Sequence, residues 1–246
     1  MNLLITEDDP LHRSYLRSVI VKALPELTSI YEAEDGDDAI AIVKEKSIDS
    51  VVMDLQMART NGVDAAKKIW RDFPNTRILF WSNYSGEAYV RGVSRIVPKG
   101  AVYGYLIKSA SEESLELAVR GIFLQDQCIV DREVRGIQMR TENTLEGLTD
   151  AEFEVLYDIA VGMTDHSIAC MRNMSTRGVQ SRLKHLYDKL ILDSKEQTPD
   201  IGPLYNSRTR AVAIALSRGL LNVEGLKARQ ADLDRWLSSV RPSTHS

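Results

Sequence analysis

Cysteine and histidine are scarce in this sequence, and the few that occur are not spaced like metal ligands. The two cysteines, Cys128 and Cys170, form no Cys-x-x-Cys pair, and such sparing use is typical of a reduced cytosolic protein. The four histidines, at positions 12, 166, 185 and 245, also lack metal-ligand spacing. We therefore expect a cytoplasmic protein without a metal centre built on histidine or cysteine.

Long apolar runs are absent as well. No stretch of the sequence approaches the roughly 20 apolar residues of a membrane-spanning helix. The N-terminal segment MNLLITEDDP has no basic region, and its apolar core is too short for a signal peptide. We therefore expect no membrane partner.

The chain as a whole also lacks positive charge. Its formal net charge is −4 over 246 residues, so the overall balance gives no sign of nucleic-acid binding and charge must be examined locally. A composition of 43% hydrophobic and 27% charged residues fits a soluble globular protein of one or two domains.

Five short apolar runs alternate with helix-like segments over the first 120 residues. The runs are residues 2–6, 29–33, 50–54, 77–81 and 103–107. This alternation predicts an α/β domain over residues 1–123, with a five-stranded parallel, doubly wound sheet covered by helices on both faces. Ligands of such sheets bind outside the carboxyl ends of the strands, so Asp54, which closes the third run, should stand at the rim.

The pattern of apolar residues changes after residue 123. Residues 124–146 are polar and lack a clear period, which we interpret as a linker. Residues 147–222 contain four helix candidates and predict an all-α domain, with a capping box formed by Thr149 and Glu152 at its start.

Two further segments lengthen the helical region. Residues 191–206 contain two prolines and one glycine and are expected to form a loop. Residues 223–246 form an amphipathic tail, which we expect to dock on its own chain, with a dimer helix as the alternative. Its apolar side carries Leu226, Leu233, Leu237 and Val240.

Polar residues close four of the five predicted strands. They are Glu7, Asp8, Asp54, Ser82 and Lys108. The parallel topology brings these ends together, and crowded carboxylates repel one another unless a cation joins them. An open site of oxygen ligands suits Mg²⁺, which binds phosphate oxygens, so the chemistry favoured here is phosphoryl transfer onto a carboxylate. Each residue alone is better explained by a turn cap or a solvated charge; the argument rests on all five meeting at one edge.

These motifs resemble the receiver domain of two-component response regulators over roughly residues 1–122. The resemblance lies in the segments ITEDDP, VVMDLQM, WSN and GYLIK, in this order and spacing. It implies that Asp54 is the phosphoacceptor and that Ser82 and Lys108 contact the phosphoryl oxygens. It also implies that Tyr105 is the switch aromatic, whose rotamer reports phosphorylation. The implied Mg²⁺ ligands are Asp8, Asp54, Glu7 through water, and the backbone carbonyl of Gln56.

Some residues depart from the receiver pattern. Glu7 stands where Asp is usual, Asn83 where Ala or Gly is usual, and Ala58 where Pro is usual. About four extra residues lie around 95–102, which puts the standard partner face of the fourth helix and fifth strand in doubt.

Charge is divided sharply within the helical region. Residues 148–171 contain five acids and no Lys or Arg, whereas residues 172–192 contain five bases and one acid, Asp188. A basic helix after an acidic one fits a helix-turn-helix, because phosphate contacts supply most non-specific affinity for DNA. The alternative is that these charges only solvate a surface helix.

Residues 148–190 resemble the LuxR-type helix-turn-helix without gaps, which makes the whole chain similar to the NarL/FixJ type of response regulator. The matching positions include LT, IA and KL, and the spaced pattern in EFEVLYDIAVG. The resemblance implies that the helix from Ser175 to about Leu190 enters the major groove of double-stranded DNA. The residues it implies at bases or phosphates are Arg177, Gln180, Ser181, Arg182, Lys184 and Lys189.

We therefore interpret the sequence as a phosphorylation-controlled, DNA-binding transcriptional regulator that receives phosphate from a histidine kinase and acts as a homodimer on DNA. It is not expected to be an enzyme beyond slow self-catalysed phosphorylation and dephosphorylation.

Three alternatives remain. A phosphatase of the haloacid dehalogenase type needs Asp-x-Asp, but Gln56 stands where its general acid would be. A receiver that acts as an unphosphorylated binding scaffold is favoured by Asn83 and by the longer fourth-helix region, and it is opposed by the intact Asp8, Asp54 and Lys108. An RNA-binding regulator is disfavoured because stacking aromatics are lacking.

Overall fold

The computed structural model describes residues 1–83, 86–142, 147–190, 197–198, 202–203 and 205–240. It divides into two compact units, one of residues 1–85 and 89–138, the other of residues 86–88 and 139–246. Each unit has its own apolar core.

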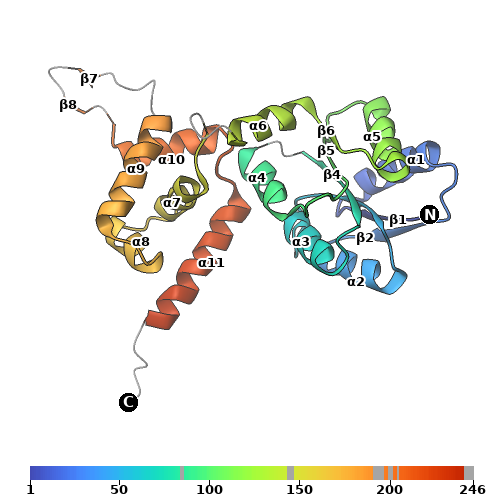
Figure 1. Cartoon of the computed structure of the whole chain (residues 1–246), viewed down its shortest axis with the longest axis horizontal. Coiled ribbons are helices and arrows are strands. Elements are labelled where there is room, and N and C mark those ends of the chain that lie inside the picture. The colour runs from blue at the N-terminus through green and yellow to red at the C-terminus, as the bar shows by residue number, and fades with distance from the viewer. Residues whose placement is uncertain (84–85, 143–146, 191–196, 199–201, 204, 241–246) are drawn as a thin grey trace, which may run out of the picture. The chain divides into compact units, whose positions relative to one another are not determined.

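The first unit is a doubly wound parallel sheet (Figure 1). Its strands are β1 (Asn2–Thr6), β2 (Ser29–Ala33), β3 (Ser50–Met53), β4 (Arg77–Ser82), β5 (Tyr103–Ile107) and β6 (Ile129–Val130). They lie in the order β2-β1-β3-β4-β5-β6, and every neighbouring pair is parallel. The helices between them are α1 (Pro10–Ala23), α2 (Gly36–Lys46), α3 (Gly62–Asp72), α4 (Glu87–Ile96) and α5 (Glu112–Gln125).

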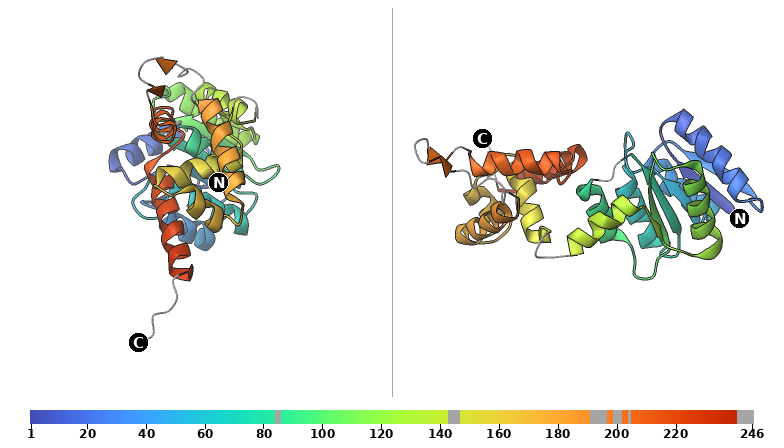
Figure 2. Two further views of the ribbon diagram at one scale, coloured as in Figure 1. Left: turned by 90° about the vertical axis from the view of Figure 1, so that its left-hand side faces the viewer. Right: turned by 90° about the horizontal axis from the view of Figure 1, so that it is seen from above.

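The helices cover both faces of this sheet (Figure 2). One face packs against α2, α3 and α4, with Val43, Ala65 and Val90 in its core. The other packs against α1 and α5, with Leu16 and Leu115 in its core. Because successive strand residues point to opposite faces, nearly every residue of β1, β3, β4 and β5 is buried, as expected for strands covered on both sides. The edge strands β2 and β6 are mostly half-buried.

The segment predicted as a linker, 124–146, instead contains regular structure. It continues from α5 into β6 and then into α6 (Arg132–Glu142). Val134 and Ile137 are buried in the core of the first unit, and Asp131 donates its backbone N–H to the Tyr105 carbonyl at 2.8 Å. The two-residue β6 is too short to show a strand period, which is why the polar composition suggested a linker. Residues 143–146 lie outside the described residues.

The second unit is helical within its described residues, apart from one short strand pair. It contains α7 (Asp150–Ala160), α8 (Asp165–Met171), α9 (Thr176–Leu190), β7 (Gln197–Thr198), β8 (Gly202–Pro203), α10 (Ser207–Ser217) and α11 (Val223–Val240). Thr149 and Glu152 form the predicted capping box at the start of α7. The loop expected over 191–206 lies largely outside the described residues.

The tail predicted over 223–246 forms α11 and packs on its own unit as far as Leu233. Leu226 and Leu233 contact the core of the second unit, whereas Val240 is exposed. Gly225 lies so close to Tyr157 that a Cβ there would stand 2.4 Å from the Tyr157 hydroxyl. Residues 241–246 lie outside the described residues.

Candidate phosphoacceptor site and DNA-reading helix

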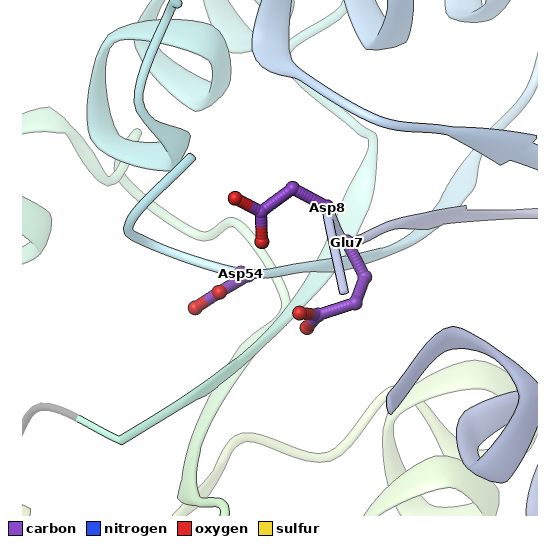
Figure 3. A group of neighbouring side chains, drawn as sticks. All are labelled: Glu7, Asp8 and Asp54. Carbon is purple, nitrogen blue, oxygen red and sulfur yellow. The ribbon is translucent and has the colours of Figure 1, made fainter. Parts of the chain in front are cut away.

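Three carboxylates meet at the carboxyl edge of the sheet. Glu7 and Asp8 follow β1 and Asp54 follows β3, and the two strands pair so that the Asp54 N–H donates to the Thr6 carbonyl at 2.9 Å. Each side chain offers one oxygen, and these oxygens all lie within 4.8 Å of one another (Figure 3). Glu7 and Asp54 are buried and Asp8 is exposed, so the cluster is open to solvent on the Asp8 side.

Lys108 joins two of these carboxylates. Its Nζ lies 2.7 Å from Glu7 Oε2 and 3.1 Å from Asp54 Oδ2, and its side chain is only 5% exposed. The Lys108 N–H donates to the Ser82 carbonyl at 2.9 Å, which continues the β4–β5 pairing by one residue and brings the lysine to the edge. One buried ammonium therefore faces two buried carboxylates, with a third nearby.

This excess of negative charge affects the acidity of Glu7. Burial raises the pKa of Glu7 and the neighbouring Asp54 charge adds to this, while the Lys108 ammonium opposes both. The pKa of Glu7 remains above its ordinary value, because burial and the Asp54 charge together outweigh the ammonium. A divalent cation bound to the carboxylates would remove this imbalance.

The loop after Asp54 is held by backbone contacts that sequence analysis did not identify. The Leu55 N–H donates to Asp54 Oδ1 at 2.6 Å, and the Gly62 N–H donates to the Leu55 carbonyl at 3.0 Å. A Cβ on Gly62 would lie 2.0 Å from the Asp54 carbonyl oxygen. The first residue of α3 must therefore be glycine for the loop to close this tightly. In the sequence, a glycine directly after the helix-capping residue Asn61 could have indicated this close approach.

Two other predicted residues lie in the same sheet. Ser82 is the last residue of β4, is fully buried, and pairs in register with Ile107, the residue before Lys108. Tyr105 lies in the middle of β5, fully buried, with its ring centroid 6.2 Å from that of Phe80. Burial raises the pKa of Tyr105, and the charges of Tyr89 and Asp54 act in the same direction. Gln56 is half-buried two residues beyond Asp54.

His12 and Trp81 also border the site, although sequence analysis did not select them. His12 Nδ1 lies 3.4 Å from Lys108 Nζ and 3.6 Å from Glu7 Oε1. Lys108 Nζ lies 4.9 Å from the centroid of the Trp81 ring. His12 could have been suspected, because a cap at Asp9 places it in the first turn of a helix that starts at the rim.

In the second unit, α9 divides into a buried and an exposed side. Val179, Leu183 and Leu186 are buried, as expected. Four of the six predicted DNA-reading residues are exposed and follow a spacing of three or four, which places them on one face of the helix. They are Arg177, Gln180, Ser181 and Lys184.

The other two predicted residues have partners within the domain. Arg182 Nη1 donates to Met174 Sδ at 3.2 Å. Lys189 Nζ lies 2.8 Å from Glu152 Oε2 and 3.0 Å from the Gly147 carbonyl oxygen. Sequence analysis placed Lys189 among the residues at bases or phosphates. In the structure its ammonium fastens α9 to the start of α7 with two of its three N–H donors, and its contact with DNA stays a prediction.

Comparison with known proteins agrees with this architecture. The response regulator receiver domain family matches residues 3–120. The chain is 30% identical to the transcriptional regulatory protein YdfI of Bacillus subtilis, over 91% of this chain and 100% of that protein. It is 28% identical to the nitrate/nitrite response regulator protein NarP of Escherichia coli, over 78% of this chain and 90% of that protein.

A solved structure supports the fold. The RcsB response regulator of Salmonella typhimurium superposes with a TM-score of 0.58 at 19% identity, covering 88% of this chain and 99% of that one. Among the described residues, no helix has the length and apolar character needed to cross a membrane. The chain belongs to the two-component response regulators of the NarL/FixJ type, transcriptional regulators that join a receiver domain to a helix-turn-helix.

Proposed function

We propose that this chain is a transcriptional regulator switched by phosphorylation of Asp54, with a histidine kinase as the phosphate donor. The observation that carries the proposal is the position of Asp54. Its carboxylate is buried at the carboxyl edge of the sheet, 3.1 Å from the Lys108 ammonium and within 4.8 Å of Glu7 and Asp8.

Mg²⁺ fits the donor set of this site. The three carboxylates offer hard oxygen ligands, and the cluster is open on the Asp8 side. The single positive charge of the Lys108 ammonium does not balance three negative charges. Asp8, Asp54, the backbone carbonyl of Gln56 and, through water, Glu7 would hold the ion. When bound, the ion would neutralise charge on the transferring phosphoryl oxygens.

The residues of the chain supply position and charge for the transfer. The bond between phosphorus and the kinase histidine nitrogen breaks, and a bond from an Asp54 carboxylate oxygen to phosphorus forms. Lys108 leaves the Asp54 oxygen to pair with the phosphoryl oxygens, while the Ser82 hydroxyl donates to another. The chain accepts the group and catalyses at most slow turnover, so we do not propose that it is an enzyme.

The output of the proposed switch is DNA binding through α9. Arg177, Gln180, Ser181 and Lys184 form the exposed face that would read base edges and phosphates in a major groove. Half-site recognition by such a helix fits a homodimer on DNA. Tyr105 lies in β5, which ends one residue before Lys108, and it is the proposed link from the phosphoryl group to the rest of the receiver. We propose a cytoplasmic location, because both proposed partners, the phosphate-donating histidine kinase domain and DNA, are reached there.

The comparisons offer no support for the scaffold alternative, because the related proteins named above are transcriptional and response regulators.

Labelling tests the acceptor directly. With Mg²⁺ and acetyl phosphate, the purified chain should acquire an acid-stable, alkali-labile phosphoryl group, as an acyl phosphate does. Asp54→Asn should abolish the label, because an amide oxygen cannot act as the carboxylate nucleophile. Asp64→Asn, which changes an exposed acid in the first turn of α3, is the matched control and should label like the unmodified chain. Equal labelling of the Asp54 variant would refute the assignment.

A further inference from the structure

The ammonium of Lys108 lies over an aromatic ring as well as between two acids. Its Nζ is 4.9 Å from the centroid of Trp81. Trp81 is the penultimate residue of β4, and it points to the α1/α5 face of the sheet, where it is only 2% exposed. A cation over the face of an indole is attracted by the ring quadrupole, and the attraction is larger when water is excluded, as it is here.

Two residues of α1 hold the indole in place. The His12 ring meets it edge-on, with centroids 5.5 Å apart and an interplanar angle of 84°. The Tyr15 ring stacks on it at 6.0 Å and 28°. The first turn of α1 is itself fixed, because the Asp9 carboxylate accepts the N–H groups of Leu11 and His12 at 2.8 and 3.0 Å.

These contacts differ in how they respond to phosphorylation. The proposed switch would change the charge on Asp54, and a cation would compete with Lys108 for Glu7. The indole is neutral and takes no part in either change. Its attraction for the ammonium therefore stays constant while the acids exchange partners.

We propose that Trp81 is a positioning residue for Lys108: its ring face, braced by His12 and Tyr15, keeps the ammonium at the Asp54 edge before and after the phosphoryl group arrives. This proposal rests on the proposed function, since it assigns Trp81 a role in the same phosphoryl transfer.

Matched substitutions at two buried tryptophans test it. Trp81→Phe keeps an aromatic face, whereas Trp81→Leu removes it. Trp70 is equally buried, but it lies on the opposite face of the sheet, where Nε1 donates to the Thr76 carbonyl. Labelling of the full chain by acetyl phosphate should slow about tenfold in Trp81→Leu and by less than about threefold in Trp81→Phe. Trp70→Leu should lose stability without slowing the labelling. Equal rates in Trp81→Leu and the unmodified chain would overturn the proposal.

A second comparison separates positioning from packing. If Trp81 acts through Lys108, Trp81→Leu should not slow labelling further in a Lys108→Ala background; an equal additional loss there would mean that the tryptophan only supports the fold. With ¹³Cε-labelled lysine, the Lys108 methylene signal should be shifted by the ring, and Trp81→Leu should remove that shift while Trp70→Leu leaves it.

The outcomes also distinguish this proposal from the proposed function. Labelling of Asp54→Asn would refute the acceptor itself. An unlabelled Asp54→Asn with a normally labelled Trp81→Leu would refute only the role of Trp81.

Discussion

At the scale of single residues, Gly62 shows how strictly the backbone around Asp54 is determined. A Cβ at this position would stand 2.0 Å from the Asp54 carbonyl oxygen and 3.0 Å from the Leu55 Cα. Both are backbone atoms, so they cannot move aside without shifting the acceptor. We expect Gly62→Ala to lower the free energy of unfolding by about 1–3 kcal/mol and to slow labelling of Asp54. Urea unfolding followed by circular dichroism and the acetyl phosphate assay measure the two effects.

Gly92→Ala is the control for this prediction. Gly92 lies within α4, and a Cβ there would meet only Val63 side-chain atoms at 3.6 and 3.7 Å, which is ordinary contact. Replacing a helix glycine with alanine should stabilise by roughly 0.5–1 kcal/mol and leave labelling unchanged. If both alanine variants behaved alike, the close approach of Gly62 to Asp54 would have no consequence.

Residue identity alone could predict the acids of the site but not their surroundings. Glu7, Asp8, Asp54 and Lys108 were found because each follows an apolar run whose strand ends at a shared edge. Trp81 gave no such signal, because a tryptophan in a buried strand is fully explained by the core. Its position over Lys108 depends on which face of β4 it occupies and on the packing of α1, and neither is encoded locally.

At the scale of elements, α11 is fastened to the helix-turn-helix by charges as well as by apolar packing. Arg172, in the turn before α9, and Arg229 of α11 share the carboxylates of Glu154 and Asp158 on α7. Asp158 is fully buried, and the Arg229 side chain is only 12% exposed. The tail therefore completes the charge balance of the domain.

Arg229→Met should weaken this unit, because it leaves two carboxylates with one guanidinium. Each lost bond to a charged group costs roughly 1.5–3 kcal/mol, so faster hydrogen exchange is expected across α7 and α11. Arg235→Met is the control, since Arg235 is 74% exposed and, within the part of the chain that the structure describes, forms an ion pair with Asp232 alone; such surface changes stay within about 0.5 kcal/mol. Mass spectrometry of exchanged peptides measures both. Equal protection in the two variants would contradict a stabilising role for the cluster.

The same cluster sets the pH dependence of that stability. Burial raises the pKa of Glu154, but the guanidiniums of Arg229 and Arg172 outweigh it and hold the pKa below its ordinary value. A lowered pKa in the folded state adds stability above the ordinary carboxyl range and loses it as the pH falls through the folded-state value. The protection that separates Arg229→Met from the unmodified chain should therefore be present at neutral pH and shrink in acid.

The sequence predicted the long apolar elements well. It predicted short or strongly polar elements, and ion pairs between distant residues, poorly. The strands β1 to β5 and the helices α7 to α10 follow from apolar period and capping residues. The strand β6 and helix α6 were missed because two strand residues carry no period and α6 is strongly polar. The pairing of Lys189 with Glu152 was not predicted, because it joins residues 37 positions apart, whereas the charge of Lys189 on its helix is visible in the sequence.

At the scale of the whole molecule, the proposed phosphoryl group must change how α9 meets DNA. A phosphoryl group adds roughly 1.5–2 negative charges, by analogy with phosphoserine, and it can only bias states that already exist. Moving such an equilibrium from 1:99 to 99:1 needs about 5.5 kcal/mol, of which charge-assisted bonds from Lys108 and Ser82 could supply part. We therefore expect phosphorylated full-length protein to bind a duplex with two half-sites, selected from random sequence, more tightly than unphosphorylated protein at the same salt concentration.

Two variants serve as controls for this prediction. Asp54→Asn treated with acetyl phosphate should bind like the unphosphorylated chain. Lys184→Ala should weaken binding in both states and lower the salt slope by roughly one unit, because the proposal assigns its exposed charge to DNA and not to the switch. Identical affinities before and after labelling, with an unchanged oligomeric state, would rule out control by phosphate and leave DNA binding under some other input.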